Sequence, residues 1–156
     1  MPAEPFSSSI QLFQRLFGTF PAHAALLDLS GRIISVNKSW LTFGRQNGLA
    51  EDYEFESKDY IEICERASQS HYAVEAMIGL LQVLNDARPT FTMVYPCHSP
   101  TEQRWFRLWV ESQMPQSPSI IMAHSRLERF AGRTIKEDVA ANVPDTRFEG
   151  LMNWRA

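Results

Sequence analysis

The stretch that decides the fold is residues 24–40, AALLDLSGRIISVNKSW. Two short apolar runs, residues 24–29 and 32–36, flank Ser30-Gly31, and apolar runs joined by a glycine turn predict a β-hairpin. Asn37 directly follows the second run, and asparagine is a preferred N-cap of helices. The stretch therefore predicts two paired strands followed by a capped helix.

Helical spacing predicts further helices on both sides of this hairpin. Residues 8–18 form an amphipathic helix, with residues 7–9, all serine, available as N-caps and Gly18 at its end. The helix after Asn37 ends near Gly48. Polar residues 50–58 predict a surface loop. The remaining helix signals are a short helix around residues 60–64 and a long one that stops before Pro89.

The long helix carries an apolar stripe at steps of three and four residues, which predicts the face it turns inward. The stripe consists of Val74, Met77, Ile78, Leu81 and Leu84. Three strands are predicted after it, at residues 90–95, 104–111 and 119–125. In the second of these, alternation places Phe106 and Leu108 on the face opposite Trp105, Arg107 and Trp109. A charged stretch, residues 126–141, is compatible with a final helix.

This order of elements predicts an α+β fold. Two hairpin strands are not stable alone, so the economical arrangement is one five-stranded antiparallel sheet with helices over one face. The chain of 156 residues, 44% of them hydrophobic, suits one globular domain.

Charge and composition exclude several classes of protein. The net charge of −3 offers no clustered basic face for direct nucleic-acid binding. No apolar run is long enough to cross a bilayer and no signal peptide is evident, so we expect a cytoplasmic protein without a membrane partner. Two cysteines, Cys64 and Cys97, are too few for a disulfide framework and are expected to be reduced.

Two runs of residues resemble the PAS (sensory-box) family, in particular PAS domains of bacterial signal transduction. The first is Asp28-Leu29-Ser30-Gly31-Arg32-Ile33 with Val36-Asn37 and Trp40; the second is Tyr95-Pro96-Cys97-His98-Ser99-Pro100 with Glu102, Arg104, Trp105 and Phe106. The resemblance covers roughly residues 8–126. It implies an N-terminal helix at residues 1–20, a PAS domain at 21–126 and a C-terminal helix or tail at 127–156.

The resemblance also implies a function. Domains of this family form a small pocket on the concave, helix-roofed face of the sheet, signal through flanking helices and frequently form homodimers. They are often attached to a histidine kinase, a diguanylate cyclase or a helix-turn-helix transcription regulator. We therefore expect a non-enzymatic sensory module with such an effector as its partner. The ligand is not named, because one fold hosts many.

The candidate pocket residues are mostly apolar, as ligand pockets are. They are Trp40, Phe43, Tyr60, Cys64, Met77, Ile78, Leu81, Phe91, Phe106 and Leu108. The alternative, that these side chains only pack against one another, stays open. The candidate dimer interface pairs the N-terminal helix with the outer sheet face: Phe13, Leu16, Phe17, Trp105, Arg107 and Trp109. Packing of that helix on its own sheet is the other option.

We expect either an unknown small molecule or no cofactor. Two further hypotheses about function are considered beside this expectation. A haem-based gas or redox sensor would use His71 as its axial ligand. A small enzyme would need titratable groups with shifted pKa values in the cavity. Cys64 lacks the Asn-Cys-Arg-Phe-type motif of flavin-binding photoreceptors. The adjacent Cys97 and His98 lack the spacing of a zinc site, so no metal site is predicted.

Overall fold

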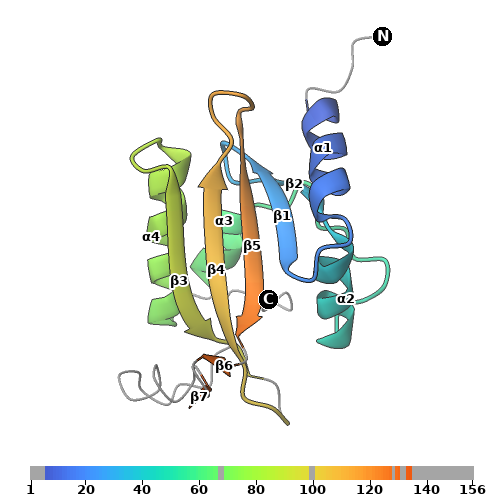
Figure 1. The fold of residues 1–156 in the computed structure, drawn as a ribbon, viewed down its shortest axis with the longest axis vertical. Coiled ribbons are helices and arrows are strands. Elements are labelled where there is room, and N and C mark those ends of the chain that lie inside the picture. The colour runs from blue at the N-terminus through green and yellow to red at the C-terminus, as the bar shows by residue number, and fades with distance from the viewer. Residues whose placement is uncertain (1–5, 67–68, 99–100, 128, 131–132, 135–156) are drawn as a thin grey trace.

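The computed structural model describes residues 6–66, 69–98, 101–127, 129–130 and 133–134. Its centre is an antiparallel sheet of five strands in the order β2-β1-β5-β4-β3 (Figure 1). The strands are β1 (His23–Asp28), β2 (Ile33–Val36), β3 (Thr90–Pro96), β4 (Trp105–Ser112) and β5 (Ser119–Leu127). The helices are α1 (Ser7–Phe17), α2 (Lys38–Gln46), α3 (Tyr60–Arg66) and α4 (His71–Leu84). The predicted fold class is confirmed.

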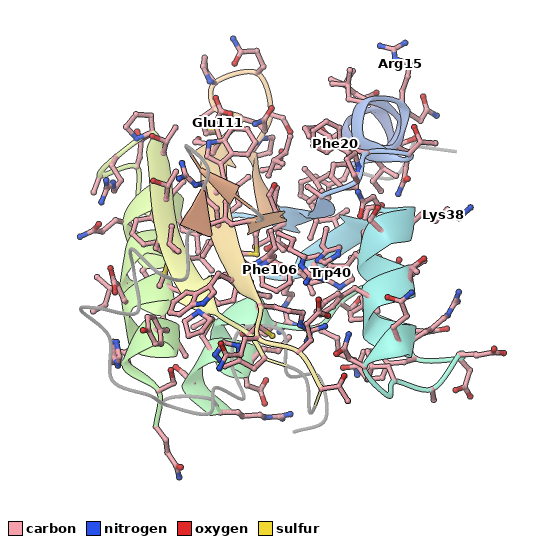
Figure 2. All side chains as sticks on the ribbon, turned by 60° about the horizontal axis from the view of Figure 1, so that its bottom comes forward. Arg15, Phe20, Lys38, Trp40, Phe106 and Glu111 are labelled. Atoms are coloured by element: carbon pink, nitrogen blue, oxygen red, sulfur yellow. The ribbon has the colours of Figure 1, made fainter. Side chains whose placement is uncertain are left out.

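Two separate hydrophobic clusters lie on the two sides of the sheet. On the side called here the inner face, the strands pack against α2, α3 and α4. On the outer face they pack against α1, which contributes the buried Phe13. Figure 2 shows Trp40 of α2 and Phe106 of β4 directed into the interior, while Arg15 and Lys38 point to solvent.

The hairpin of β1 and β2 forms as predicted. The Asp28 carboxylate accepts hydrogen bonds from the backbone N–H groups of Ser30 (2.9 Å) and Arg32 (3.0 Å) and so closes the turn. Gly31 has a φ of +90°, and a Cβ there would lie 3.0 Å from Ile61 Cγ1. The turn therefore needs glycine both for its backbone conformation and for its contact with α3.

Asn37 caps α2 as predicted, and its side chain also bonds backbone groups of neighbouring segments. Its Oδ1 accepts from the N–H groups of Trp40 and Ala24, both at 3.0 Å. Its Nδ2 donates to the carbonyl oxygens of Phe17 (2.9 Å) and Ala22 (2.8 Å). This fully buried amide thus joins the end of α1, the start of β1 and the start of α2.

The predicted inward face of α4 is wrong in part. Ile78 is 51% exposed and Leu81 38% exposed. The residues that α4 buries are instead Tyr72, Ala73, Ala76, Gly79, Leu80 and Val83. A Cβ on Gly79 would lie 2.4 Å from the Phe91 ring, so small side chains bring α4 close to β3. Both faces of α4 are apolar at helical spacing, and periodicity alone cannot choose between them.

Three smaller expectations also change. Phe55 is only 3% exposed and belongs to the inner core, so residues 50–58 are not purely surface loop. The helix α1 has no side-chain cap, and Ser9 lies inside it, with its hydroxyl bonded to Ser117. After β5 come two short strands, β6 (Arg129–Phe130) and β7 (Arg133–Thr134), where a helix was predicted. The rest of the predicted C-terminal helix and tail lies outside the described residues.

Candidate functional site

A hydrogen-bonded trio of polar side chains lies inside the apolar inner core. Tyr60 begins α3, Tyr95 comes from β3 and His124 from β5, and all three are completely buried. The Tyr95 hydroxyl lies 2.6 Å from Nδ1 of His124, and the Tyr60 hydroxyl lies 3.3 Å from Nε2. Both ring nitrogens of His124 therefore face a hydroxyl.

Burial keeps every member of this trio uncharged at neutral pH. Burial, with a smaller contribution from nearby His23, lowers the pKa of His124 to about 3. Burial raises the pKa values of Tyr60 and Tyr95 well above their usual range. A neutral imidazole carries one N–H, so one ring nitrogen donates to a hydroxyl while the other accepts. The trio is a chain of neutral hydrogen bonds.

The two cysteines belong to the same core but are not activated as nucleophiles. Burial raises the pKa of Cys64 to about 12. Burial also raises the pKa of Cys97 to about 11, although the nearby Arg104 acts in the opposite direction. The thiolate is the reactive form of cysteine, and these shifts suppress it.

A second histidine lies at the edge of this core. His23 is the antiparallel partner of His124 across β1 and β5. Its ring lies 4.4 Å from that of Phe43, and its buried Nδ1 makes no hydrogen bond to a described residue. Burial, together with the positive charge of Arg104, lowers its pKa to about 4. Arg104 itself lies over the Phe43 ring, 5.1 Å from its centre.

The structure brings most of the predicted pocket residues together. Seven are buried in the single inner core: Trp40, Phe43, Tyr60, Cys64, Phe91, Phe106 and Leu108. Met77 packs against that core and is partly buried. Ile78 and Leu81, as described above, lie on the far side of α4 and do not face it.

The predicted interface residues divide into three groups. Phe13, Phe17 and Trp109 meet in the outer cluster within one chain, so α1 packs on its own sheet. Leu16 is 59% exposed and Arg107 is exposed. Trp105 is buried near the other end of β4, with its ring 6.0 Å from that of His98.

His71, the residue of the haem hypothesis, is exposed at the start of α4 and lines a groove on the outer side of that helix. This position does not direct it into the inner core, where His23 and His124 lie instead. Within the described residues, no group of three or more His, Cys, Asp or Glu side chains is placed to hold a metal ion. None of the helices described is long and apolar enough to span a bilayer.

Sequence analysis missed Tyr95, His124 and His23 as members of the inner core. A signal was present for the two strands that carry the trio. His124 alternates with Ile120 and Met122, and the structure buries all three on the inner face. Tyr95 alternates in the same way with Phe91 and Met93. Inner-face polar residues could therefore have been found by extending each strand's alternation to its end.

Comparison with known sequences gives one relative of unknown role. The chain is 31% identical over 132 residues to an uncharacterized 104.1 kDa protein in the hypE 3′ region of Rhodobacter capsulatus. The match covers 81% of this chain but only 14% of that protein, so the chain spans about a seventh of its relative's length. No family model matches the sequence.

Solved structures give a clear likeness of fold. The PAS domain of BvgS from Bordetella pertussis superimposes with a TM-score of 0.58 at 16% identity, over 86% of this chain and 96% of that one. The phage VqmA-DPO complex has a TM-score of 0.58 at 18% identity, over 92% of this chain and 64% of that one. Given the same five-stranded sheet and the same covering helices, this chain has the fold of a PAS domain.

Proposed function

We propose that this chain is a sensory domain whose inner face binds a small uncharged molecule, and that its flanking segments transmit the binding event to an effector. The observation that carries the proposal is the buried trio of Tyr60, His124 and Tyr95. Buried polar groups cost free energy unless they are paired, and ligand pockets typically combine apolar walls with a few such groups. The trio supplies that combination.

The protonation states define the chemical class of the ligand. A charged ligand beside His124 would be surrounded by neutral histidine, tyrosine and cysteine side chains, since the charge of Arg104 lies at the edge of the core, over the Phe43 ring. A neutral molecule with one donor or acceptor can instead replace one of the hydrogen bonds to His124. We therefore propose a small, largely apolar ligand that carries a single hydrogen-bonding group.

The same shifts support binding without turnover. An enzyme would place groups near the pKa that its chemistry requires, and a nucleophilic cysteine would have a lowered pKa. Here burial moves the thiols and the phenols away from their charged, reactive forms. We propose a module that recognises its ligand and does not transform it.

Asn37 offers a path from the inner face to α1. It fixes the start of α2, which carries Trp40, and it also holds the carbonyl group of Phe17 at the end of α1. A ligand that displaces Trp40 would move the cap of α2 and, through the same amide, the end of α1. We propose this connection as the route by which binding reaches the N-terminal flank.

We propose further that the domain forms a homodimer through α1. This helix buries Phe13 on its own sheet, yet it leaves Leu12, Leu16 and the following Phe20 exposed. A second copy presents the same stripe, and a twofold axis makes such a surface self-complementary. Sedimentation should show a dimer that Leu16→Glu weakens, whereas Arg107→Glu on the outer sheet face should not. A monomeric wild-type chain at micromolar concentration would contradict this part.

The effector is proposed here only as a class of protein. Because the chain spans only part of its relative, we propose that it acts with a further domain or partner, such as a kinase, a cyclase or a transcription regulator. We also propose that it acts in the cytoplasm.

The test of the ligand proposal is native mass spectrometry of the full chain, with an absorbance spectrum of the same sample. We expect a small added mass on the wild type that Tyr95→Phe diminishes and the exposed Arg107→Gln retains. No added mass after purification, and none after incubation with a panel of neutral compounds, would contradict the proposal. A Soret band would support a haem sensor instead.

A further inference from the structure

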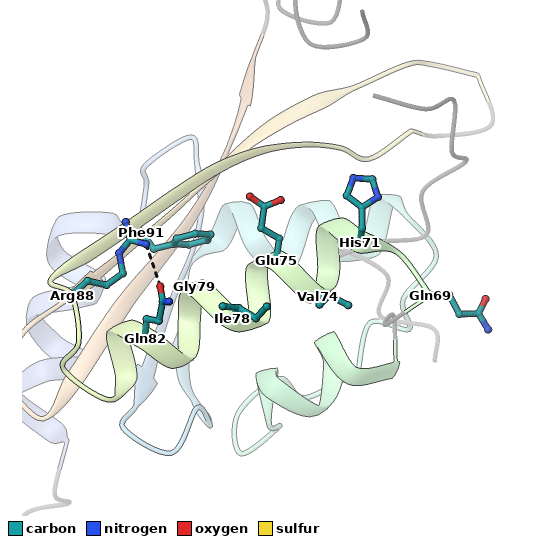
Figure 3. Close-up of a pocket in the computed structure, with 9 residues that line it drawn as sticks. All are labelled: Gln69, His71, Val74, Glu75, Ile78, Gly79, Gln82, Arg88 and Phe91. Atoms are coloured by element: carbon teal, nitrogen blue, oxygen red, sulfur yellow. Dashed lines mark hydrogen bonds between the residues drawn. The ribbon is translucent and has the colours of Figure 1, made fainter. Parts of the chain in front are cut away.

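A groove of about 640 Å³ runs along the outer side of α4, beside the start of β3 (Figure 3). Its floor includes Val74, Ile78 and Gly79 of α4 and the ring of Phe91 of β3. Glu75 and Arg88 lie at its sides, and Arg88 is held by a 3.2 Å hydrogen bond to Gln82. The groove lies on the side of α4 that faces away from most of the inner core, and it shares the Phe91 ring with that core.

The apolar face of α4 that borders this groove has no cover among the described residues. Ile78 is 51% exposed and the neighbouring Leu81 is 38% exposed. A helix at a protein surface normally turns polar residues outward, and a helix that is apolar on all sides is normally buried. An exposed apolar stripe beside a groove indicates an interaction surface.

The course of the chain brings a segment of this protein to the groove. The last described residue, Thr134, follows β5, whose Leu127 end pairs with Trp105 and, through it, lies beside Pro96 at the end of β3. Figure 1 shows the His71 end of α4 at this same end of the sheet. The described part of the chain therefore ends near one mouth of the groove.

The C-terminal segment is long enough to reach along the whole groove. With 14 residues, α4 is about 21 Å long at roughly 1.5 Å per residue. An extended stretch of about 13 residues, from residue 135 to residue 147, covers up to about 40 Å.

The sequence of this segment fits an apolar groove beside a helix. Phe148, Leu151 and Met152 are spaced as one face of a helix, and helices bind grooves through anchors at such spacing. Charged residues of both signs, Arg147 and Glu149, flank the first anchor, as Glu75 and Arg88 flank the groove. We propose that residues 147–154 bind in the groove between α4 and β3 and cover Ile78 and Leu81.

This contact would connect the C-terminal flank to the helix that roofs the inner face. Because α4 buries Leu80 and Val83 in the inner core, a shift of α4 would alter the groove on its other side. The C-terminal segment would then be bound or released according to the state of the core.

The proposal can be tested on the full chain by paramagnetic relaxation. A nitroxide is attached to Gly150→Cys, which is selective because Cys64 and Cys97 are buried. Methyl signals are then compared for Ile78 and for Leu16, an aliphatic residue on α1 that is similarly exposed within one chain. We expect the Ile78 signal to lose most of its intensity and the Leu16 signal to keep it. Replacing Phe148 by Ser in the labelled chain should restore the Ile78 signal.

Equal intensities for Ile78 and Leu16 would overturn the proposal. A mixed sample separates a second copy from the chain's own segment, with methyl labels on one population and nitroxide on the other. Loss of the Ile78 signal in that mixture would show that the segment comes from another molecule, and would overturn the intramolecular contact as well.

Discussion

The two faces of the sheet differ in what covers them and in what they bury. The outer face carries small side chains such as Ala24 and Ala123, on which the single helix α1 rests with Phe13. The inner face carries large aromatic side chains and the buried trio around His124, beneath three helices. One face positions a helix, whereas the other encloses a hydrogen-bonded trio of a histidine and two tyrosines.

This difference is the basis for the proposal that the inner face is the recognition surface. An apolar core is sufficient for stability, and completely buried polar groups add cost unless their partners are well placed. The inner face bears that cost at Tyr60, Tyr95 and His124, whereas the buried polar groups of the outer face are the small hydroxyls of Ser35 and Ser119. We therefore propose that the inner face senses the ligand and that α1 transmits the signal.

The largest expected effect is on the free energy of unfolding, when one buried aromatic ring is removed from each face of the sheet in turn. Phe106→Ala should lower the free energy of unfolding by about 3–5 kcal/mol, because the sheet and its helices cannot close around the lost ring. Phe13→Ala should cost less, because α1 can detach while the five strands stay paired. Urea unfolding of both variants measures the difference. A larger loss for Phe13→Ala would mean that the outer face stabilises the fold most.

A middle-sized effect is expected at Asn37, the residue that joins α1 to α2. Asn37→Ala removes the cap of α2 and leaves buried N–H and carbonyl groups without their partner, at a cost of about 2 kcal/mol or more. Hydrogen exchange should show faster exchange at the start of α2 and throughout α1. Ser39→Ala serves as the matched control, because it removes a hydroxyl that donates to the carbonyl oxygen of Phe20 and leaves the Asn37 amide in place. Unchanged exchange in α1 would refute the proposed route.

The third effect depends on pH and belongs to the inner face alone. The folded pKa values of His23 and His124, about 4 and about 3, lie below the unfolded value of about 6.5. The unfolded chain therefore binds more protons below pH 6.5, and the stability present above that pH declines as the pH falls toward 4. Each histidine contributes up to about 1.4 kcal/mol per pH unit. His23→Gln should flatten the pH dependence between pH 6 and 4.5; an unaltered slope would contradict the assignment.

Much of the fold was predictable because its signals are local. The turn at Gly31, the cap at Asn37 and the alternation through Phe106 and Leu108 each depend on neighbours in sequence, and all three are confirmed. The orientation of α4 was not predictable in the same way. It depends on the contact of Gly79 with Phe91, a tertiary contact between elements, while the apolar pattern of the helix suits either orientation.

The sequence predicted where the candidate site lies better than it predicted which polar groups the site contains. The aromatic residues of the inner core follow from periodicity, but the trio joins three separate elements and leaves no motif in the sequence. The exposed stripe at Ile78 shows the same limit, because sequence pattern identifies an apolar surface without saying what covers it.

Methyl NMR of the full chain under xenon pressure tests the assignment of sensing to the inner face most directly. Xenon binds apolar sites that can open to admit a small molecule. We predict saturable shifts at inner-face methyl groups, such as those of Leu108, Val110 and Met122, and none at Leu26 and Ile121 of the outer face. Shifts confined to the outer face, or no saturable shift on either face, would contradict the account.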